Sequence, residues 1–398
     1  MKYRVLSSIY YENKELFEET YKNRINSEST YKFKFKINND DAFFVINKNI
    51  LKQLDEIHKL DKLLALKSDG LPKIALTQFT RRCIVDEIKM TNDIEGVIST
   101  RKEINEILND SVGSKKGNRL YGLVKKYEML VEEDIELNTC HDIRKIYDEL
   151  VLKEVIQEDS QHAPDGAIFR KDIVYVKNSQ GRTIHQGITP EEKIIEVMSE
   201  CLSSLNSGNF NKLVNIAIFH YMFGYIYPFY DGNGRISRFI SSYLLARELD
   251  SLVAFRISYT IKQNINTYYK SFKMINDSKN RGELTKFVEM FFDMLIESLE
   301  ELCESIDERN NRLNYFANIV NHIPNTDSNV RRLLFILVQN TLFAEAGLSV
   351  KELVEITDLG DSKVRSTLLY FSDMIYVNKD GRKKIYNMNL DVLSEINN

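Results

Sequence analysis

Apolar residues recur at intervals of three and four along most of the chain, and this spacing predicts helices. The pattern is clear in residues 76–152, where Ile84, Ile88, Ile104 and Ile107 follow it. Residues 1–75 form a lead-in with one short alternating run, followed by polar turn residues and a helix. That run, Tyr31–Ile37, is typical of a strand.

Residues 153–190 interrupt the helical spacing. Ile173–Val176 and Arg182–His185 flank the turn residues Asn178–Gly181, and this arrangement predicts a β-hairpin. Helices resume at Pro190 and continue to about Arg312, so we expect a second helical region over 153–312.

A polar stretch at 321–328 precedes a last domain, predicted over 328–398. Helices are expected at Arg331–Gln339, from the N-cap Ser349 to Thr357, and from a cap at Asp361 or Ser362 to about Asp373. A hairpin of Ile375–Asn378 and Lys384–Met388 should follow. Three helices and a hairpin are typical of a winged helix.

Glycine and proline are scarce, with 16 and 5 residues among 398, which favours long helices with short connections. The predicted fold is therefore mainly α. The apolar share of 43% excludes global disorder, and a net charge of −4 excludes a protein that coats polyanions by bulk charge.

The four cysteines are widely spaced, which predicts free thiols rather than a zinc site or a disulfide framework. No stretch has the ~20 apolar residues of a membrane span, and the N-terminus lacks a signal-peptide pattern. We expect a cytoplasmic protein that does not enter membranes.

The segment from Tyr227 to Arg238 predicts an anion site. Gly232 and Gly234 lie between a buried helix (Leu213–Ile226) and a helix expected from about Arg235 to Leu249. Free N–H groups and the dipole at a helix start attract phosphate. Arg235 and Arg238 lie three apart on that first turn and would repel the dipole unless an anion binds there.

This segment, YPFYDGNGRISR, resembles the HPFxDGNGRxxR motif of the Fic family, with Tyr227 in place of the histidine. IAIFHYMFGYI resembles the helix before that motif, and Thr91–Gly96 matches the inhibitory pattern (S/T)xxxE(G/N). Ser258–Tyr259 and Asn264–Tyr269 resemble its SxY…NRxxYY stretch, with Ile265 in place of arginine. The resemblance covers roughly Leu76 to the C-terminus.

The resemblance implies a helical bundle with a hairpin flap, and transfer of AMP from ATP to a hydroxyl side chain of a target protein. Asp231 would hold Mg²⁺, and the flap residues Thr183, Ile184 and His185 would hold the target by strand addition. Tyr268 or Tyr269 would lie beside the adenine. The other implied nucleotide contacts are Gly232, Asn233, Gly234, Arg235, Ile236, Ser237 and Arg238.

Glu95 and Thr91 are four apart and share a helix face. A Glu95 carboxylate aimed at Arg238 would take the guanidinium that the γ-phosphate needs, and it would repel the nucleotide. We therefore expect an autoinhibited site.

Tyr227 stands where the family has its general base, with Asp231 and Arg235 as the other implied catalytic residues. An unperturbed phenol has a pKa near 10 against about 6.5 for imidazole, so it is a poor base at neutral pH. His220 precedes Tyr227 by two helical turns, about 10 Å, which is too far to replace it. We expect His185 to contact target or solvent, so transfer should be weak or absent.

An alternative is a DNA-binding regulator that senses nucleotide. Residues 328–398 carry no net charge, but Lys379, Arg382, Lys383 and Lys384 cluster on the wing, and Lys363 and Arg365 begin the third helix. DNA contact, protein interaction and homodimerisation through this domain are equal alternatives. A modified activity, such as AMP removal or phosphoryl transfer, ranks third.

Overall fold

The structure, a computed structural model, describes residues 3–110, 112–177, 181–208, 210–380 and 383–395. The chain divides into two compact units. Unit 1 comprises residues 1–61 and 85–299, and unit 2 comprises 62–84 and 300–398. The division cuts across the predicted range 76–152, because the spacing along one helix does not tell which other helices cover its apolar face.

Unit 1 is mainly helical, as predicted. Its complete helices are α1 (Leu6–Glu12), α2 (Lys14–Ile25), α5 (Arg101–Leu108), α6 (Tyr121–Glu128), α7 (Cys140–Leu150), α8 (Leu152–Glu158), α9 (Glu191–Asn206), α10 (Lys212–Ile226), α11 (Asn233–Glu248), α12 (Ser251–Ala254), α13 (Ile257–Gln263) and α14 (Ile265–Ile275). Three longer helices have residues in both units: α3 (Lys48–Asp69), α4 (Lys73–Glu95) and α15 (Thr285–His322). Short 3₁₀ turns lie at Ser160–His162 and Ser278–Asn280.

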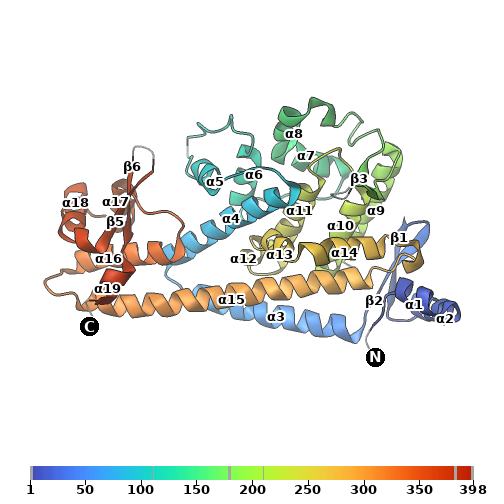
Figure 1. Ribbon diagram of the computed structural model, residues 1–398, viewed down its shortest axis with the longest axis horizontal. Helices are drawn as coiled ribbons and strands as arrows, with labels where there is room; N and C mark the ends of the chain where they lie inside the picture. Colours follow the sequence, from blue (N-terminus) through green and yellow to red (C-terminus); the bar gives the residue numbers. More distant parts are fainter. Residues whose placement is uncertain (1–2, 111, 178–180, 209, 381–382, 396–398) are drawn as a thin grey trace. The chain divides into compact units, whose positions relative to one another are not determined.

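Helix α10 forms the centre of unit 1, between α9 and α11 (Figure 1). Nearly all of its 15 residues are buried, which agrees with the apolar character of its sequence on every side. The helix ends at Tyr227, whose left-handed backbone (φ 53°) turns the chain into the glycine-containing loop. A buried helix therefore fixes where that loop begins.

The lead-in contains a β-hairpin of which the sequence predicted only one strand. Strands β1 (Thr30–Ile37) and β2 (Asp40–Val45) pair antiparallel across Asn38 and Asn39, both with positive φ. Strand β2 lacks an alternating pattern because Ala42–Val45 are buried consecutively. Phe43 and Val45 pack against α1 and α2 in a small core with Leu6, Ile9 and Phe17.

The hairpin predicted in the middle of the chain is confirmed. Strands β3 (Tyr175–Lys177) and β4 (Thr183–Gln186) are antiparallel, with Val176 opposite His185. Residues 178–180 of the predicted turn lie outside the described residues.

The last part of unit 2 has the predicted order of three helices and a hairpin. Its elements are α16 (Ser328–Phe343), α17 (Val350–Thr357), α18 (Asp361–Tyr370), a 3₁₀ turn at Ser372–Met374, β5 (Ile375–Asp380), β6 (Lys383–Met388) and α19 (Leu390–Glu395). Ser349 caps α17 in a reciprocal capping box with Glu352, as expected of an N-cap.

Several predicted boundaries differ from the structure, and α16 extends beyond the expected Arg331–Gln339 at both ends. Helix α18 begins after Gly360, which has no side chain, so the expected cap by Asp361 or Ser362 is wrong. Helix α15 continues to His322 rather than ending near Arg312, because Leu313, Phe316, Ile319 and Val320 continue its apolar face and are buried.

The cations at the start of α18 are paired with carboxylates of their own unit. Lys363 Nζ lies 3.0 Å from Asp327, and Arg365 Nε lies 2.5 Å from Asp361. These pairs reduce the positive charge that the helix offers to a phosphate backbone. Arg382 of the predicted basic wing lies outside the described residues, so DNA contact stays a prediction.

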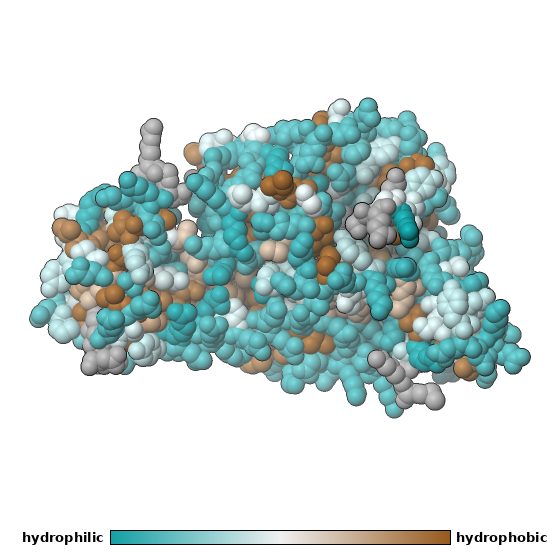
Figure 2. Space-filling model, viewed as in Figure 1, coloured by the Kyte–Doolittle hydropathy of each residue, from teal (hydrophilic) through white to brown (hydrophobic). Residues whose placement is uncertain are grey.

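The face seen in Figure 2 is mostly hydrophilic with small, separate hydrophobic patches. Among the helices of the described residues, none combines the length and hydropathy that a bilayer span requires. All four cysteines are buried thiols, as predicted.

One glycine allows two helices to approach closely. A Cβ on Gly122 in α6 would lie 2.0 Å from the carbonyl oxygen of Glu149 in α7, and backbone cannot move aside as a flexible side chain can. We predict that Gly122→Ala lowers the free energy of unfolding in urea by about 1–3 kcal/mol, despite the better helix propensity of alanine. Gly117→Ala, with no atom within 4 Å of its new methyl group, is the control. Equal stabilities of the two variants would contradict the close packing.

Candidate functional site

The loop between α10 and α11 is held by side chains on both sides. Asn233 accepts a hydrogen bond from the Phe229 amide (2.9 Å) and donates one to the Phe229 carbonyl (2.8 Å). Gly232 is the N-cap of α11 with φ 79°, a conformation that glycine adopts without strain. The helix therefore begins at Asn233, two residues before the predicted start. The amides of the first turn of α11 have no acceptor within the helix.

A cavity of about 210 Å³ opens above the start of α11. Several predicted site residues line it together: Glu95, Ile184, His185, Tyr227, Asn233, Gly234, Ser237, Arg238, Tyr268 and Tyr269. Val176, His220, Gly224, Phe272, Lys273 and Asn276 complete the lining. The flap hairpin, α4, α10, α11 and α14 thus meet at one concave site.

The other predicted site residues do not line this cavity. Ile236 is buried in the core, and Arg235 is also fully buried. Asp231 and Gly232 lie on the loop, Thr91 lies in α4, and Thr183 is exposed on β4. Of the two arginines expected on the first turn, Arg238 lines the cavity, whereas Arg235 is fully buried and does not.

Arg238 is bound by the end of α4. Its Nε donates to the Thr91 hydroxyl (2.8 Å), and its Nη2 donates to the Thr91 carbonyl (3.1 Å) and to Glu95 Oε1 (2.7 Å). The Arg238 side chain is 2% exposed and that of Glu95 is 23% exposed. Burial alone would lower the pKa of Arg238, but the Glu95 carboxylate raises it. The contact predicted between these two side chains is present.

Glu95 also covers the first turn of α11. A Cβ on Gly234 would lie 2.0 Å from Glu95 Oε1 and 2.8 Å from Arg238 Nη1. The carboxylate is therefore against the backbone of that turn, where the helix dipole favours negative charge. An anion from solution could not occupy the same position while Glu95 is there.

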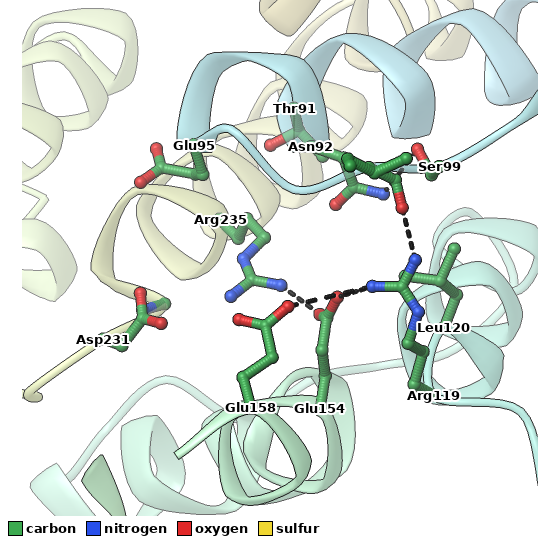
Figure 3. A network of polar contacts seen from close by, with 12 residues as sticks. Thr91, Asn92, Glu95, Ser99, Arg119, Leu120, Glu154, Glu158, Asp231 and Arg235 are labelled. Atoms are coloured by element: carbon green, nitrogen blue, oxygen red, sulfur yellow. Dashed lines mark hydrogen bonds and ion pairs between the residues drawn. The ribbon is translucent and has the colours of Figure 1, made fainter.

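Arg235 has a carboxylate partner that the sequence did not indicate. Its Nη1 donates to Glu154 of α8, which is 1% exposed, and Glu154 also binds Arg119 (2.8 Å; Figure 3). Burial raises the pKa of Glu154, although both guanidinium groups oppose this. The Nε and Nη2 atoms of Arg235 are buried without a hydrogen-bond partner in the described chain.

Tyr227 faces the cavity as a neutral phenol. Burial, and then the charges of Glu95 and Asp231, raise the pKa of Tyr227 to about 12. The two arginines, which could have stabilised a phenolate, are already paired with Glu95 and Glu154. Tyr227 therefore has no basic form near neutral pH.

The two histidines near the cavity are both held by the protein. His220 is buried, with its ring nitrogens 2.8 Å from Ser241 Oγ and Tyr268 Oη, and burial followed by Arg238 lowers its pKa to about 3. His185 bonds the Tyr225 carbonyl (2.6 Å) through Nε2, and Asn276 donates to its Nδ1 (3.3 Å). Burial lowers the pKa of His185. His185 thus anchors the flap in this structure, which differs from its expected contact with target or solvent.

The two tyrosines expected near adenine differ in exposure. Tyr268 is buried and its hydroxyl bonds His220, whereas the Tyr269 ring is 48% exposed at the rim of the cavity. Ser237 contributes a hydroxyl 3.2 Å from His220 Nδ1. Tyr269 is therefore the tyrosine that remains accessible to a ligand.

Arg170 is a site residue that sequence reasoning missed. It is fully buried and donates to the carbonyls of Tyr227 (2.9 Å), Asp172 (2.6 Å) and Ile188 (2.8 Å). It joins the base of the flap to the loop after α10. An isolated arginine in an irregular segment gave no sequence signal.

Glu87, one turn before Thr91, was also missed. It is fully buried and accepts a hydrogen bond from the Ser258 amide (2.8 Å) at the start of α13. Burial raises its pKa to about 7, against the effect of Ser258. Glu87 thus fixes the body of α4 in the core and leaves its last turn to carry Thr91 and Glu95.

Asp231 is the residue suited to a metal ion. Its Oδ1 accepts from the Gly232 amide (2.5 Å), and the residue is partly exposed on the loop that precedes α11. One carboxylate beside a helix start fits the needs of Mg²⁺, which takes few protein ligands and completes its shell with water or phosphate oxygens. In the described residues no group of three or more acidic, histidine or cysteine side chains forms a closed metal site.

A model of the Fic/DOC family matches residues 138–245. The protein adenylyltransferase Fic of Drosophila ananassae is 26% identical over 275 residues, which are 63% of this chain and 49% of that protein. The protein of the same name from Drosophila yakuba is 27% identical over 198 residues, 50% of this chain and 34% of that protein. The matched part thus spans about half or less of these relatives.

A solved structure of a Fic family protein from Desulfovibrio desulfuricans G20 has a similar fold. The TM-score is 0.55 at 17% identity, over 86% of this chain and 97% of that one. The helical arrangement is therefore shared.

The raised pKa of Tyr227 makes a prediction for alkaline stability. A phenol whose folded-state pKa (about 12) exceeds its unfolded value (about 10) contributes stability below pH 10 that is lost as pH rises through 12. Between pH 8 and pH 11 the protein should lose about 1 kcal/mol more unfolding free energy than Tyr227→Phe. Urea denaturation of both proteins at the two pH values measures this, and an equal loss would contradict the burial of the hydroxyl.

Proposed function

We propose that this chain, which carries a Fic/DOC family domain, binds ATP at the start of α11 and belongs to the protein adenylyltransferase type, with Glu95 holding the site closed. The observation that carries this proposal is the position of the Glu95 carboxylate, which pairs with Arg238 and lies against Gly234. A carboxylate there marks the first turn of α11 as an anion site. The name of the relatives supports the choice of AMP transfer.

The phosphates would bind along the first turn of α11. Arg238 supplies the charge that Glu95 now neutralises, and Arg235 supplies two buried N–H groups without partners. A buried donor without an acceptor is costly, so an incoming phosphate oxygen would remove that cost. Asp231 would hold Mg²⁺ beside the phosphates, and the ion would supply charge neutralisation there.

The adenosine part would occupy the rest of the cavity. Tyr269 and Phe272 offer aromatic surface on α14, and Gly224 leaves room beside Phe272. The target would lie along the flap, whose exposed Thr183 and Ile184 leave an edge for an added strand. Arg170 and His185 keep this edge at a fixed distance from the loop after α10.

In the transfer step the hydroxyl oxygen of the target would attack the α-phosphorus of ATP. A bond from that oxygen to phosphorus forms, the bond to the bridging oxygen breaks, pyrophosphate leaves and the hydroxyl proton goes to a base. Tyr227, protonated to about pH 12, cannot accept that proton at neutral pH. General base catalysis is typically worth about 10²–10⁴-fold, so we propose slow or absent transfer.

If Glu95 and the γ-phosphate compete for Arg238, Glu95→Gly should tighten ATP binding about tenfold or more, because a charge-assisted hydrogen bond becomes available to the ligand. ADP, without a γ-phosphate, should gain less. Calorimetry with Mg²⁺ present measures both affinities. Asp93→Asn on the same helix, whose carboxylate pairs with Lys89 outside the cavity, is the control and should change neither. Equal gains for ATP and ADP would contradict the competition, and no binding of either by Glu95→Gly would contradict the phosphate site.

Restoring a base should restore transfer once Glu95 is removed. We predict that Tyr227→His with Glu95→Gly transfers AMP to itself or to lysate proteins at least ~10²-fold faster than Glu95→Gly alone. Intact-mass measurement after incubation with Mg·ATP detects the adduct. Tyr227→Phe with Glu95→Gly is the control for loss of the phenol and should stay slow. Should Glu95→Gly alone match the histidine variant, another residue must act as the base.

A further inference from the structure

Arg119 joins two parts of the site that are distant in sequence. Its Nη1 lies 2.8 Å from Glu154 Oε1, and its Nη2 donates to the carbonyl of Ile98. The other oxygen of Glu154 holds Arg235. Figure 3 shows the Arg119 guanidinium between Glu154 and the backbone that follows the end of α4. One buried carboxylate is therefore shared by the motif arginine and by an arginine that grips a loop.

That loop is folded back onto the helix that carries Glu95. The Val97 amide donates to the Asn92 carbonyl (3.0 Å), and the Asn92 side chain donates to Ser99 Oγ (3.1 Å). These two bonds join Val97 and Ser99 to the last turn of α4. Arg119 connects this piece to α8, while Glu87 holds only the body of the helix one turn further back.

We propose that Arg119 is the positioning residue for Glu95: it holds the loop after α4 against the Glu154–Arg235 pair and so keeps the Glu95 carboxylate on Arg238. Arginine suits this task because its rigid fork can bind a carboxylate and a carbonyl at once. The inference concerns the regulation of the proposed nucleotide site and rests on it for the binding readout. The loop readout below is independent of any nucleotide.

The role can be tested without disturbing the core. The Arg119 side chain is 29% exposed, and Glu154 keeps Arg235 as a partner when Arg119 is removed. Its other charged neighbour is the half-exposed Glu158, whose Oε1 is 3.9 Å from Nη1. Arg119→Ala removes both contacts. Arg119→Lys keeps a positive charge for Glu154 but replaces the two-nitrogen fork by a single nitrogen, and it serves if the alanine variant does not fold.

Arg247 offers a matched control at the other end of α11. It is 32% exposed and likewise bridges a loop, with bonds to the carbonyls of Val131 (2.8 Å) and Glu133 (2.7 Å) and to Asp134 (3.3 Å). Arg247→Ala therefore removes the same kind of contact at the C-terminal end of α11, whereas Glu95 contacts the first turn of that helix. Any general effect of losing such an arginine should appear in it equally.

Hydrogen exchange of the full chain gives the first result. Arg119→Ala and Arg119→Lys should exchange faster over residues 91–99, whereas Arg247→Ala should not. Calorimetry gives the second: both Arg119 variants should bind ATP about 2- to 30-fold more tightly, the usual range for residues that modulate coupling, with a smaller gain for ADP. Adding Arg119→Ala to Glu95→Gly should not tighten ATP binding further, because the Glu95 carboxylate that Arg119 positions is already absent.

Three outcomes overturn the proposal. If hydrogen exchange over residues 91–99 is unchanged in both Arg119 variants, Arg119 does not hold the loop after α4. An ATP gain that persists in the Glu95→Gly background shows that Arg119 does not act through Glu95. Weaker binding of ATP and ADP alike shows that Arg119 only supports Arg235. If Glu95→Gly itself binds no nucleotide, the proposed function fails, while the exchange result still decides whether Arg119 holds the loop.

Discussion

The site depends on the burial of two positive charges at the start of one helix. The dipole of α11 disfavours cations at its N-terminus, and both Arg235 and Arg238 are withdrawn from water, so each needs a carboxylate. Glu154 supplies one and Glu95 the other. The two carboxylates differ in exposure, at 1% and 23%, and this difference divides their roles. Glu154 belongs to the core, whereas Glu95 lies in the cavity wall, where an anionic ligand can take its position.

The contacts of Glu95 are separate from those that hold the body of α4 in the core. Glu87 is bonded to the start of α13, so the body of α4 belongs to the packed core. Only its last turn carries the contacts to Arg238. Releasing the Glu95 carboxylate would break polar contacts at the end of α4, while the apolar contacts of the core would remain.

The helices that carry the site were predictable because their signals are local. The apolar sequence of α10, the glycine loop and the spacing of Thr91 and Glu95 each act within a few residues. Glu154, Arg170 and Arg119 were not predictable, because a single charged residue has no period and its partner is far away in the chain. The burial of Arg235 was missed for the same reason. The spacing along α11 gave the position of Arg235 around that helix relative to Arg238, but it did not indicate that Glu154 of α8 packs against Arg235. Strand β2 was missed because a strand buried on both faces does not alternate.

The polar residues around Tyr227 also contribute to the stability of the fold. Asn233 closes the loop, Arg170 binds the Tyr227 carbonyl, and Arg235 neutralises Glu154, so each of these side chains satisfies buried polar groups. Replacing Asn233 or Arg170 would leave backbone groups without these partners, and replacing Arg235 would leave the buried Glu154 with Arg119 as its remaining close cation. The backbone carbonyl of position 227 holds Arg170, and any residue supplies a carbonyl, so a change of side chain there would leave this bond in place. The Tyr227 side chain itself interacts with Asn233.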